Sequence, residues 1–123
     1  MDATDFPEKG EWIDLSFLRV YSGDNKELMK KFLQSFLERT PAMMATIDEQ
    51  WAAKDFHSLT RTMHSLKPQL SYVGITALSG VVNFIEESAR SGRETELITG
   101  KLQEMKTILD KAYKELQDQL NTL

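Results

Sequence analysis

The sequence predicts an all-α fold, an antiparallel up-down four-helix bundle with one or two short additional helices at its N-terminal side. Three observations lead to this prediction. Between the few prolines and glycines (three and six in 123 residues), apolar residues recur three and four positions apart, the spacing of one face of a helix. No segment alternates apolar and polar residues over a strand's length, and no hairpin turn such as Asn-Gly occurs. The long helical segments are joined by short connections, which makes neighbouring helices antiparallel.

Length and composition narrow the classes of protein further. With 41% hydrophobic residues, the 123-residue chain is long enough for one domain with its own core. The absence of cysteine excludes disulfides, thiol catalysis and cysteine-bound zinc. No apolar run reaches the ~20 residues of a membrane span, and no apolar segment follows a basic start as in a signal peptide. A net charge of −4 disfavours nucleic acid as a partner. We therefore expect a cytoplasmic protein that neither spans a membrane nor binds nucleic acid.

The N-terminal region divides into an arm and the start of the bundle. Residues 1–11 contain Pro7 and Gly10 and are expected to form a flexible acidic arm, whereas residues 12–123 form the helical domain. Met1 and the shortness of this arm favour a stand-alone chain. Asp14 is expected to cap a short helix that ends at Ser22-Gly23.

The next helical segment begins and divides at recognisable signals. Asp24, followed three residues later by Glu27, forms a capping box at its start. Thr40-Pro41 is interpreted as the start of a further helix, with proline at the first helical position. A bent but continuous helix through Pro41 is the alternative.

The clearest helical pattern begins after Asp55. An apolar stripe with alternating spacings of three and four runs to Gly74, which ends the helix; it consists of Phe56, Leu59, Met63, Leu66, Leu70 and Val73. The same spacing returns from Ile75 to Ala89 and ends at Ser91-Gly92, and a last helix extends from Ile98 to Leu120. No phosphate-binding glycine loop, G-x-S-x-G or H-E-x-x-H motif is present.

The two histidines, His57 and His64, lie on this helix seven positions apart. At 100° per residue, the mean direction of the apolar stripe lies about 130° from His64 and about 150° from His57, so both side chains are expected to face solvent. Their separation of about 10 Å along the axis is too long for one metal ion, and no carboxylate stands one turn from His64. We therefore expect no metal site, and we assign no role to His57.

His64 has surroundings that suit a nucleophile. Lys67, three positions later, shares its face, and the short side chains of Thr60 and Ser71 flank it. An imidazole that accepts a phosphoryl group must be exposed, neutral and close to a positive charge. A histidine at its ordinary pKa near 6.5 is mostly neutral at cytoplasmic pH.

These residues resemble the signature of a known family. Met63-His64-Ser65-Leu66-Lys67, followed by Val73-Gly74, resembles the motif of the histidine-containing phosphotransfer (HPt) domain. Residues 12–118 are similar to such domains in further stretches, which are Asp14-Leu15-Ser16, Ser22-Gly23-Asp24, Phe32 to Phe36, Lys54-Asp55-Phe56, Ile85-Glu86 and Ala89-Arg90-Ser91-Gly92.

The resemblance implies a four-helix bundle that acts as a phosphorelay intermediate. His64 would accept a phosphoryl group from the aspartyl phosphate of a receiver domain and pass it to another response regulator, with Lys67 supporting charge and orientation. Gly74 would let the chain turn into the next helix. Implied partners are response-regulator receiver domains and a hybrid sensor histidine kinase. The protein would be a monomeric carrier without its own turnover and without a cofactor, because the receiver supplies Mg²⁺.

The chain departs from the family pattern at three positions. Pro68 stands where a glycine is usual, so we expect a local kink and a solvated His64 carbonyl. Met63 replaces an alanine, and some apolar surface around it is expected to be kept for the receiver. Gln69 is a candidate hydrogen-bond partner near the site, although it could equally be polar surface.

Charge patterning adds a prediction about partner binding. Residues 1–14 carry five acids and one base, which accounts for the whole net charge, whereas Lys54, Arg61 and Lys67 outnumber Asp55 around His64. Such a basic patch suits an acidic receiver pocket, and we expect Thr60, Arg61 and Ser71 to contact the partner.

Two other functions remain open at this stage. One is an adaptor or scaffold that keeps the HPt fold without phosphotransfer. The other is an unrelated bundle that binds a ligand between its helices, with methionines and Trp51 lining a cavity. An enzyme with catalysis of its own is not expected, because no carboxylate pair or nucleophile–base arrangement can be assembled.

Overall fold

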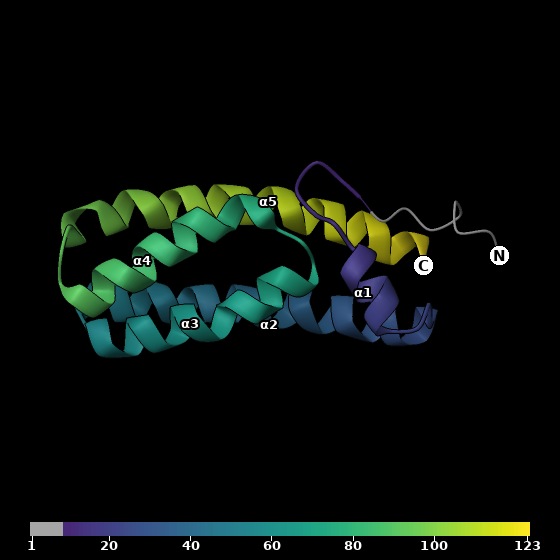
Figure 1. Ribbon diagram of the computed structural model, residues 1–123, viewed down its shortest axis with the longest axis horizontal. Helices are drawn as coiled ribbons and strands as arrows, with labels where there is room; N and C mark the ends of the chain where they lie inside the picture. The colour runs from purple at the N-terminus through teal and green to yellow at the C-terminus, as the bar shows by residue number, and fades with distance from the viewer. Residues whose placement is uncertain (1–8) are drawn as a thin grey trace.

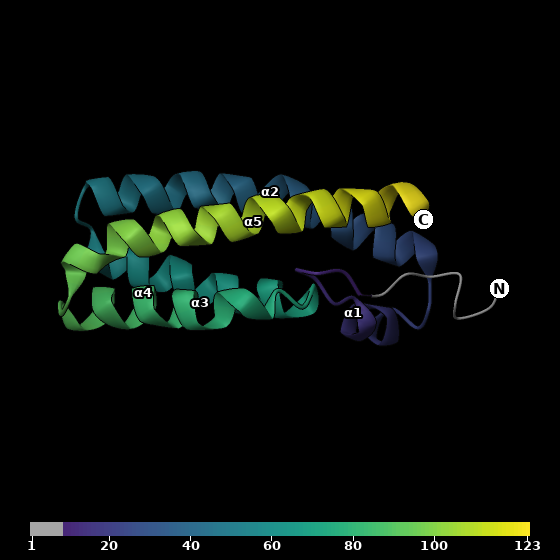
Figure 2. The same cartoon turned by 90° about the horizontal axis from the view of Figure 1, so that it is seen from above.

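The computed structural model describes residues 9–123, and residues 1–8 of the expected arm lie outside the described residues. The helices follow one another in the order α1 (Ser16–Tyr21), α2 (Lys26–Ala52), α3 (Phe56–Tyr72), α4 (Ser79–Ser91) and α5 (Ile98–Thr122). Short 3₁₀ turns, η2 (Thr76–Leu78) and η3 (Thr95–Leu97), precede α4 and α5. The four long helices run antiparallel to their neighbours, and α1 packs at one end of the bundle (Figure 1, Figure 2). The all-α bundle with one short N-terminal helix is thus confirmed.

The apolar stripe of α3 points into the core, as its spacing predicts. Leu59, Met63 and Leu66 are fully buried, and the half-buried Phe56 packs at the edge of the core. The prediction of apolar surface around Met63 is wrong, because this side chain has 0% exposure. Instead, the exposed large apolar side chains of the described residues lie mostly on α1 and at the start of α2; they are Phe17, Val20, Tyr21, Leu28 and Leu97.

Two predicted helix caps are displaced by one residue. The N-cap of α1 is Leu15, although the Asp14 carboxylate accepts the Ser16 amide at 3.0 Å and so satisfies one free donor of the first turn. The capping box of Asp24 and Glu27 is wrong. Asn25 is the N-cap of α2, and its side chain accepts from the Leu28 amide at 3.1 Å. Asp24 itself takes a positive φ of 62° in the turn.

Helix α2 continues through Pro41, so the predicted start of a new helix there is wrong and the continuous alternative is correct. Proline removes one backbone donor but leaves the apolar face intact. Phe36 before it and Met44 and Ile47 after it are buried on the same side of α2. Packing on both sides of Pro41 therefore holds one helix where local rules allow two.

Glycines end α3 and α4 as predicted. Gly74 follows α3 with φ +64°, and Gly92 is the left-handed C-cap of α4 with φ +73°. Gly74 also lies against the N-terminal segment, where the Asp14 amide donates to the Val73 carbonyl at 3.1 Å. The Glu115 carboxylate of α5 accepts the backbone amides of Glu11 and Trp12. These contacts attach residues 11–14 to the end of α3 and to α5.

Within residues 9–123, none of the helices combines the length and apolar character that a membrane crossing requires.

Candidate histidine site

His64 lies on the outer face of α3 with its side chain 75% exposed. Its Nδ1 atom is 3.3 Å from Oε2 of Glu86 on α4. When Nδ1 carries the proton, it donates to the carboxylate, and Nε2 on the far side of the ring keeps its lone pair. Within residues 9–123, no hydrogen bond engages Nε2. The predicted exposure of both histidines is confirmed, since His57 is exposed as well.

Glu86 is the buried centre of the site, with 5% of the residue exposed. Its carboxylate receives Lys67 Nζ at 2.9 Å on Oε2 and 3.1 Å on Oε1, and Arg90 at 2.7 Å on Oε1. Burial alone would raise the pKa of Glu86. The hydrogen bond and charge of Lys67, with the bonds from His64 and Arg90, outweigh burial and lower that pKa below its ordinary value. The carboxylate is therefore ionised at neutral pH.

The expectation that no carboxylate stands one turn from His64 is correct along α3, but it misses Glu86. It considered only residues within a turn on the same helix, whereas Glu86 lies 22 positions later and comes from the neighbouring helix. The sequence does indicate that Glu86 faces inward. Val82 and Ala89, four positions before and three after Glu86, both face the core, so the α4 pattern places this charged residue on an inward face.

Lys67 is already engaged in this structure. Both oxygens of Glu86 bind its ammonium, and its side chain is 34% exposed. Arg90 on α4 is 53% exposed and bridges two carboxylates, Glu86 at 2.7 Å and Glu87 at 2.5 Å. The positive charge that the sequence predicted around His64 is thus partly neutralised by the Glu86 carboxylate on α4.

The short residues that flank His64 bond to their own helix. The Thr60 hydroxyl donates to the Phe56 carbonyl at 2.7 Å, and the Ser71 hydroxyl donates to the Lys67 carbonyl at 3.2 Å. Arg61 is exposed on the same helix. The Thr60 and Ser71 hydroxyls are thus held against α3, and the imidazole of His64 stays accessible with its side chain 75% exposed.

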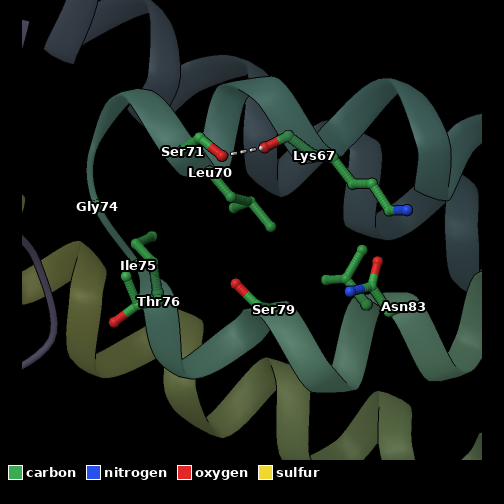
Figure 3. A pocket seen from close by; sticks show the side chains of 9 residues that line it. Lys67, Leu70, Ser71, Gly74, Ile75, Thr76, Ser79 and Asn83 are labelled. Atoms are coloured by element: carbon green, nitrogen blue, oxygen red, sulfur yellow. Dashed lines mark hydrogen bonds between the residues drawn. The ribbon is translucent and has the colours of Figure 1, made fainter. Parts of the chain in front are cut away.

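A groove of about 330 Å³ runs between α3 and α4 beside the site. Figure 3 shows Lys67 and Ser71 on α3 facing Ser79 and Asn83 on α4 across it. Its apolar lining consists of Leu70, Ile75 and Val82. Gly74, where the chain turns from α3 toward α4, also lines the groove.

Pro68 and Gln69 are the two remaining positions for which the sequence predicted an effect on the site. Pro68 is exposed inside a continuous α3, and because proline has no amide hydrogen it cannot donate to the His64 carbonyl. The predicted kink stays a prediction. Gln69 is no partner of the site, because its amide points to α2 and donates to Met43 Sδ at 3.6 Å.

Met44, one of the methionines considered as cavity-lining residues, lines a pocket of about 270 Å³ between α2 and α5. The described part of the chain contains no group of three or more His, Cys, Asp or Glu that could hold a metal ion. Trp51 packs on Phe56 and donates to the Thr99 hydroxyl at 3.1 Å, while Met29 and Met105 fill the core.

A four-helix bundle with an exposed, carboxylate-supported histidine is the architecture of a histidine phosphotransfer protein of phosphorelay signalling. The chain belongs to the Hpt domain family, whose model matches residues 31–123. The resemblance seen in the sequence is thereby confirmed. Among curated proteins, the signal transduction histidine-protein kinase BarA of Shigella flexneri is 26% identical over 89 residues, which are 72% of this chain. The chain spans about a tenth of that kinase, 10% of its length. No solved structure matches the chain significantly.

Proposed function

We propose that this protein is a phosphorelay intermediate that accepts a phosphoryl group on His64 from a receiver-domain aspartyl phosphate and passes it to another response regulator. One observation supports this most directly. Nε2 of His64 is free in solvent while Nδ1 is held by Glu86 at 3.3 Å. A hybrid sensor histidine kinase, the kind of protein that carries receivers upstream of such a carrier, is the proposed source.

The proposed transfer needs no base from this chain. The Nε2 lone pair attacks phosphorus, an N–P bond forms, and the P–O bond to the aspartyl oxygen breaks as the carboxylate leaves with the electron pair. The Nδ1 proton stays in place, and the positive charge that develops on the ring lies beside the Glu86 carboxylate. The reverse sequence delivers the phosphoryl group to the second receiver. Mg²⁺ is assigned to the receiver, so no cofactor is proposed here.

The proposed docking surface surrounds His64 and extends toward α1. Thr60, Arg61 and Ser71 lie on the same helix as the histidine, within about 11 Å along its axis. Beyond them, Tyr72 contacts the rings of Phe17 at 5.4 Å and Tyr21 at 5.8 Å. A typical interface of about 800 Å² per partner is wide enough to cover both His64 and these exposed α1 rings. The α1 patch therefore takes the place of the apolar surface expected around Met63.

The test is phosphoryl transfer from a phosphorylated receiver domain to the purified protein, followed as acid-labile, alkali-stable label. We expect label on the wild type, none on His64→Gln, and unchanged labelling of His57→Ala, the matched exposed histidine on the same helix. We also expect Tyr21→Ser to weaken receiver binding severalfold without changing the labelled residue. Label that survives His64→Gln refutes the site. A wild type that binds receivers but takes no label from any of them would show a scaffold instead.

A further inference from the structure

Three groups of different kinds meet at one carboxylate in this site. Oε2 of Glu86 takes His64 Nδ1 and Lys67 Nζ, and Oε1 takes Arg90 together with the longer contact from Lys67. A carboxylate offers about four acceptor positions, so the two cations and the imidazole nearly fill it. Any one of them can leave only if the others continue to satisfy the charge.

The resting arrangement leaves the phosphoacceptor without a cation of its own. Lys67, the ammonium one turn from His64, is held by Glu86 with both of its contacts at 2.9 and 3.1 Å. A phosphoryl group on Nε2 would bring two negative charges to the solvent side of the ring. The ring, now positively charged, would at the same time bind Glu86 more strongly through Nδ1.

Lys67 and Arg90 differ in how easily they can move. The Lys67 ammonium sits on a flexible stem and binds as a point charge, so it can swing from Glu86 toward the new anion. Arg90 lies on the same helix as Glu86, four positions later, and its guanidinium is fixed between Glu86 and Glu87. A buried carboxylate that lost all of its cations would be strongly destabilised. Arg90 is therefore the group that can keep Glu86 compensated.

We propose that Lys67 exchanges partners during phosphorylation, leaving Glu86 for the phosphoryl oxygens, and that Arg90 is a positioning residue that makes this exchange possible by retaining Glu86. The inference rests on the proposed function only in taking His64 as the acceptor. It needs no receiver, because a small phosphoramidate donor can supply the phosphoryl group: its P–N bond breaks and ammonia leaves as the N–P bond to His64 forms.

The test is a double-mutant cycle on the rate of labelling by phosphoramidate. We expect Lys67→Ala to slow labelling about tenfold and Arg90→Gln to slow it about fivefold, so a full loss of the second effect in the double mutant would be a coupling within the range found for groups in one network. In the Lys67→Ala background, Arg90→Gln is expected to have no further effect, because no lysine remains to be released. Arg90→Lys should restore most of the rate. Arg93→Gln, an exposed arginine without a contact to Glu86, is the matched control and should label normally.

Two further measurements keep the outcome interpretable. Thermal unfolding of each variant identifies a loss of rate that merely follows a loss of fold. In Glu86→Gln, which cannot hold Lys67 as a counter-ion, the effect of Arg90→Gln should disappear. Equal slowing by Arg90→Gln with and without Lys67, or no slowing at all, overturns the inference while leaving His64 as the acceptor. Absence of label on wild-type His64 would overturn the acceptor itself, whereas labelling by phosphoramidate without transfer from receivers would refute only the proposed partner.

Discussion

Replacing Gly74 with alanine should destabilise the protein far more than the same change at Gly92, the glycine that ends α4. Both Gly74 and Gly92 have a positive φ, +64° and +73°, which costs an alanine about 1–2 kcal/mol. Only Gly74 is also crowded. A Cβ atom there would lie 2.3 Å from the Asp14 carbonyl oxygen and 2.8 Å from its amide nitrogen, whereas nothing lies within 4 Å at Gly92.

The additional cost at Gly74 comes from the segment that must move. Shifting Asp14 by about 1 Å breaks its amide bond to the Val73 carbonyl, which is worth about 1 kcal/mol. It also loosens the buried side chains of Ile13 and Leu15 on either side, for about another 1 kcal/mol. Gly74→Ala should therefore lose about 3–4 kcal/mol, and Gly92→Ala about 1–2 kcal/mol.

Urea unfolding, followed by tryptophan fluorescence, measures both values. An unfolding entropy of about 2.1 cal/mol/K per residue corresponds to about 0.26 kcal/mol/K for this chain, so the two variants should differ by about 8 °C in Tm. Because both changes remove a glycine at positive φ, the difference isolates the contact with Asp14. A free energy of unfolding for Gly74→Ala within about 0.5 kcal/mol of that for Gly92→Ala would refute the steric argument.

Two more predictions concern charge and capping. Because the folded-state pKa of Glu86 is lowered from 4.5, the stability that this carboxylate contributes through Lys67 is fully present above that value and is lost as the pH falls below it toward the folded-state pKa. The unfolding free energy of Glu86→Gln should therefore fall less steeply than that of the wild type in acid titrations below about pH 4.5; parallel curves would contradict the shift. Asn25→Ala should cost about 1 kcal/mol by removing the bond to the Leu28 amide, whereas Asp24→Asn should stay within about 0.5 kcal/mol in the same denaturation assay. If Asp24→Asn destabilised the protein more than Asn25→Ala, Asp24 rather than Asn25 would be the cap of α2.

Much of the fold follows from local information. The spacing of apolar residues after Asp55 predicts a helix and the face of that helix that points into the core. The helix ends at Gly74 and Gly92 follow from the positive φ that glycine accepts there. Sequence rules for helix caps fail to predict the cap where two neighbouring residues both satisfy them. Asp24 and Asn25 are both good caps, and only the turn geometry, with its positive φ at Asp24, selects Asn25.

The helix through Pro41 has the same kind of explanation on a larger scale. Thr40-Pro41 satisfies the rules for a helix start, and nothing within a few residues decides against it. The buried residues before and after Pro41 pack against α3 and α5 as one face, which holds α2 together. That information belongs to the assembled bundle and cannot be taken from the segment.

The site also has one part that the sequence could predict and one part that it could not. The exposure of His64 and its proximity to Lys67 depend on helical phase alone, so both could be predicted. The role of Glu86 depends on how α3 and α4 pack, and 22 residues separate it from the histidine. Its inward direction was available from the pattern of α4, but the group it would meet there was not.

The stability of the fold alone does not explain why a carboxylate stands at position 86. An apolar side chain on this inward face would avoid the desolvation of a charge and could pack against α3 at no cost in stability, as buried ion pairs replaced by apolar residues often do. The carboxylate instead requires two cations and uses its remaining acceptor capacity on the ring of a histidine that is 75% exposed. The fold gains little from that last contact, because the imidazole could be solvated equally well. When Nδ1 carries the proton, this contact favours the tautomer whose Nε2 is unprotonated and exposed to solvent, which is the state that the proposed phosphoryl transfer needs.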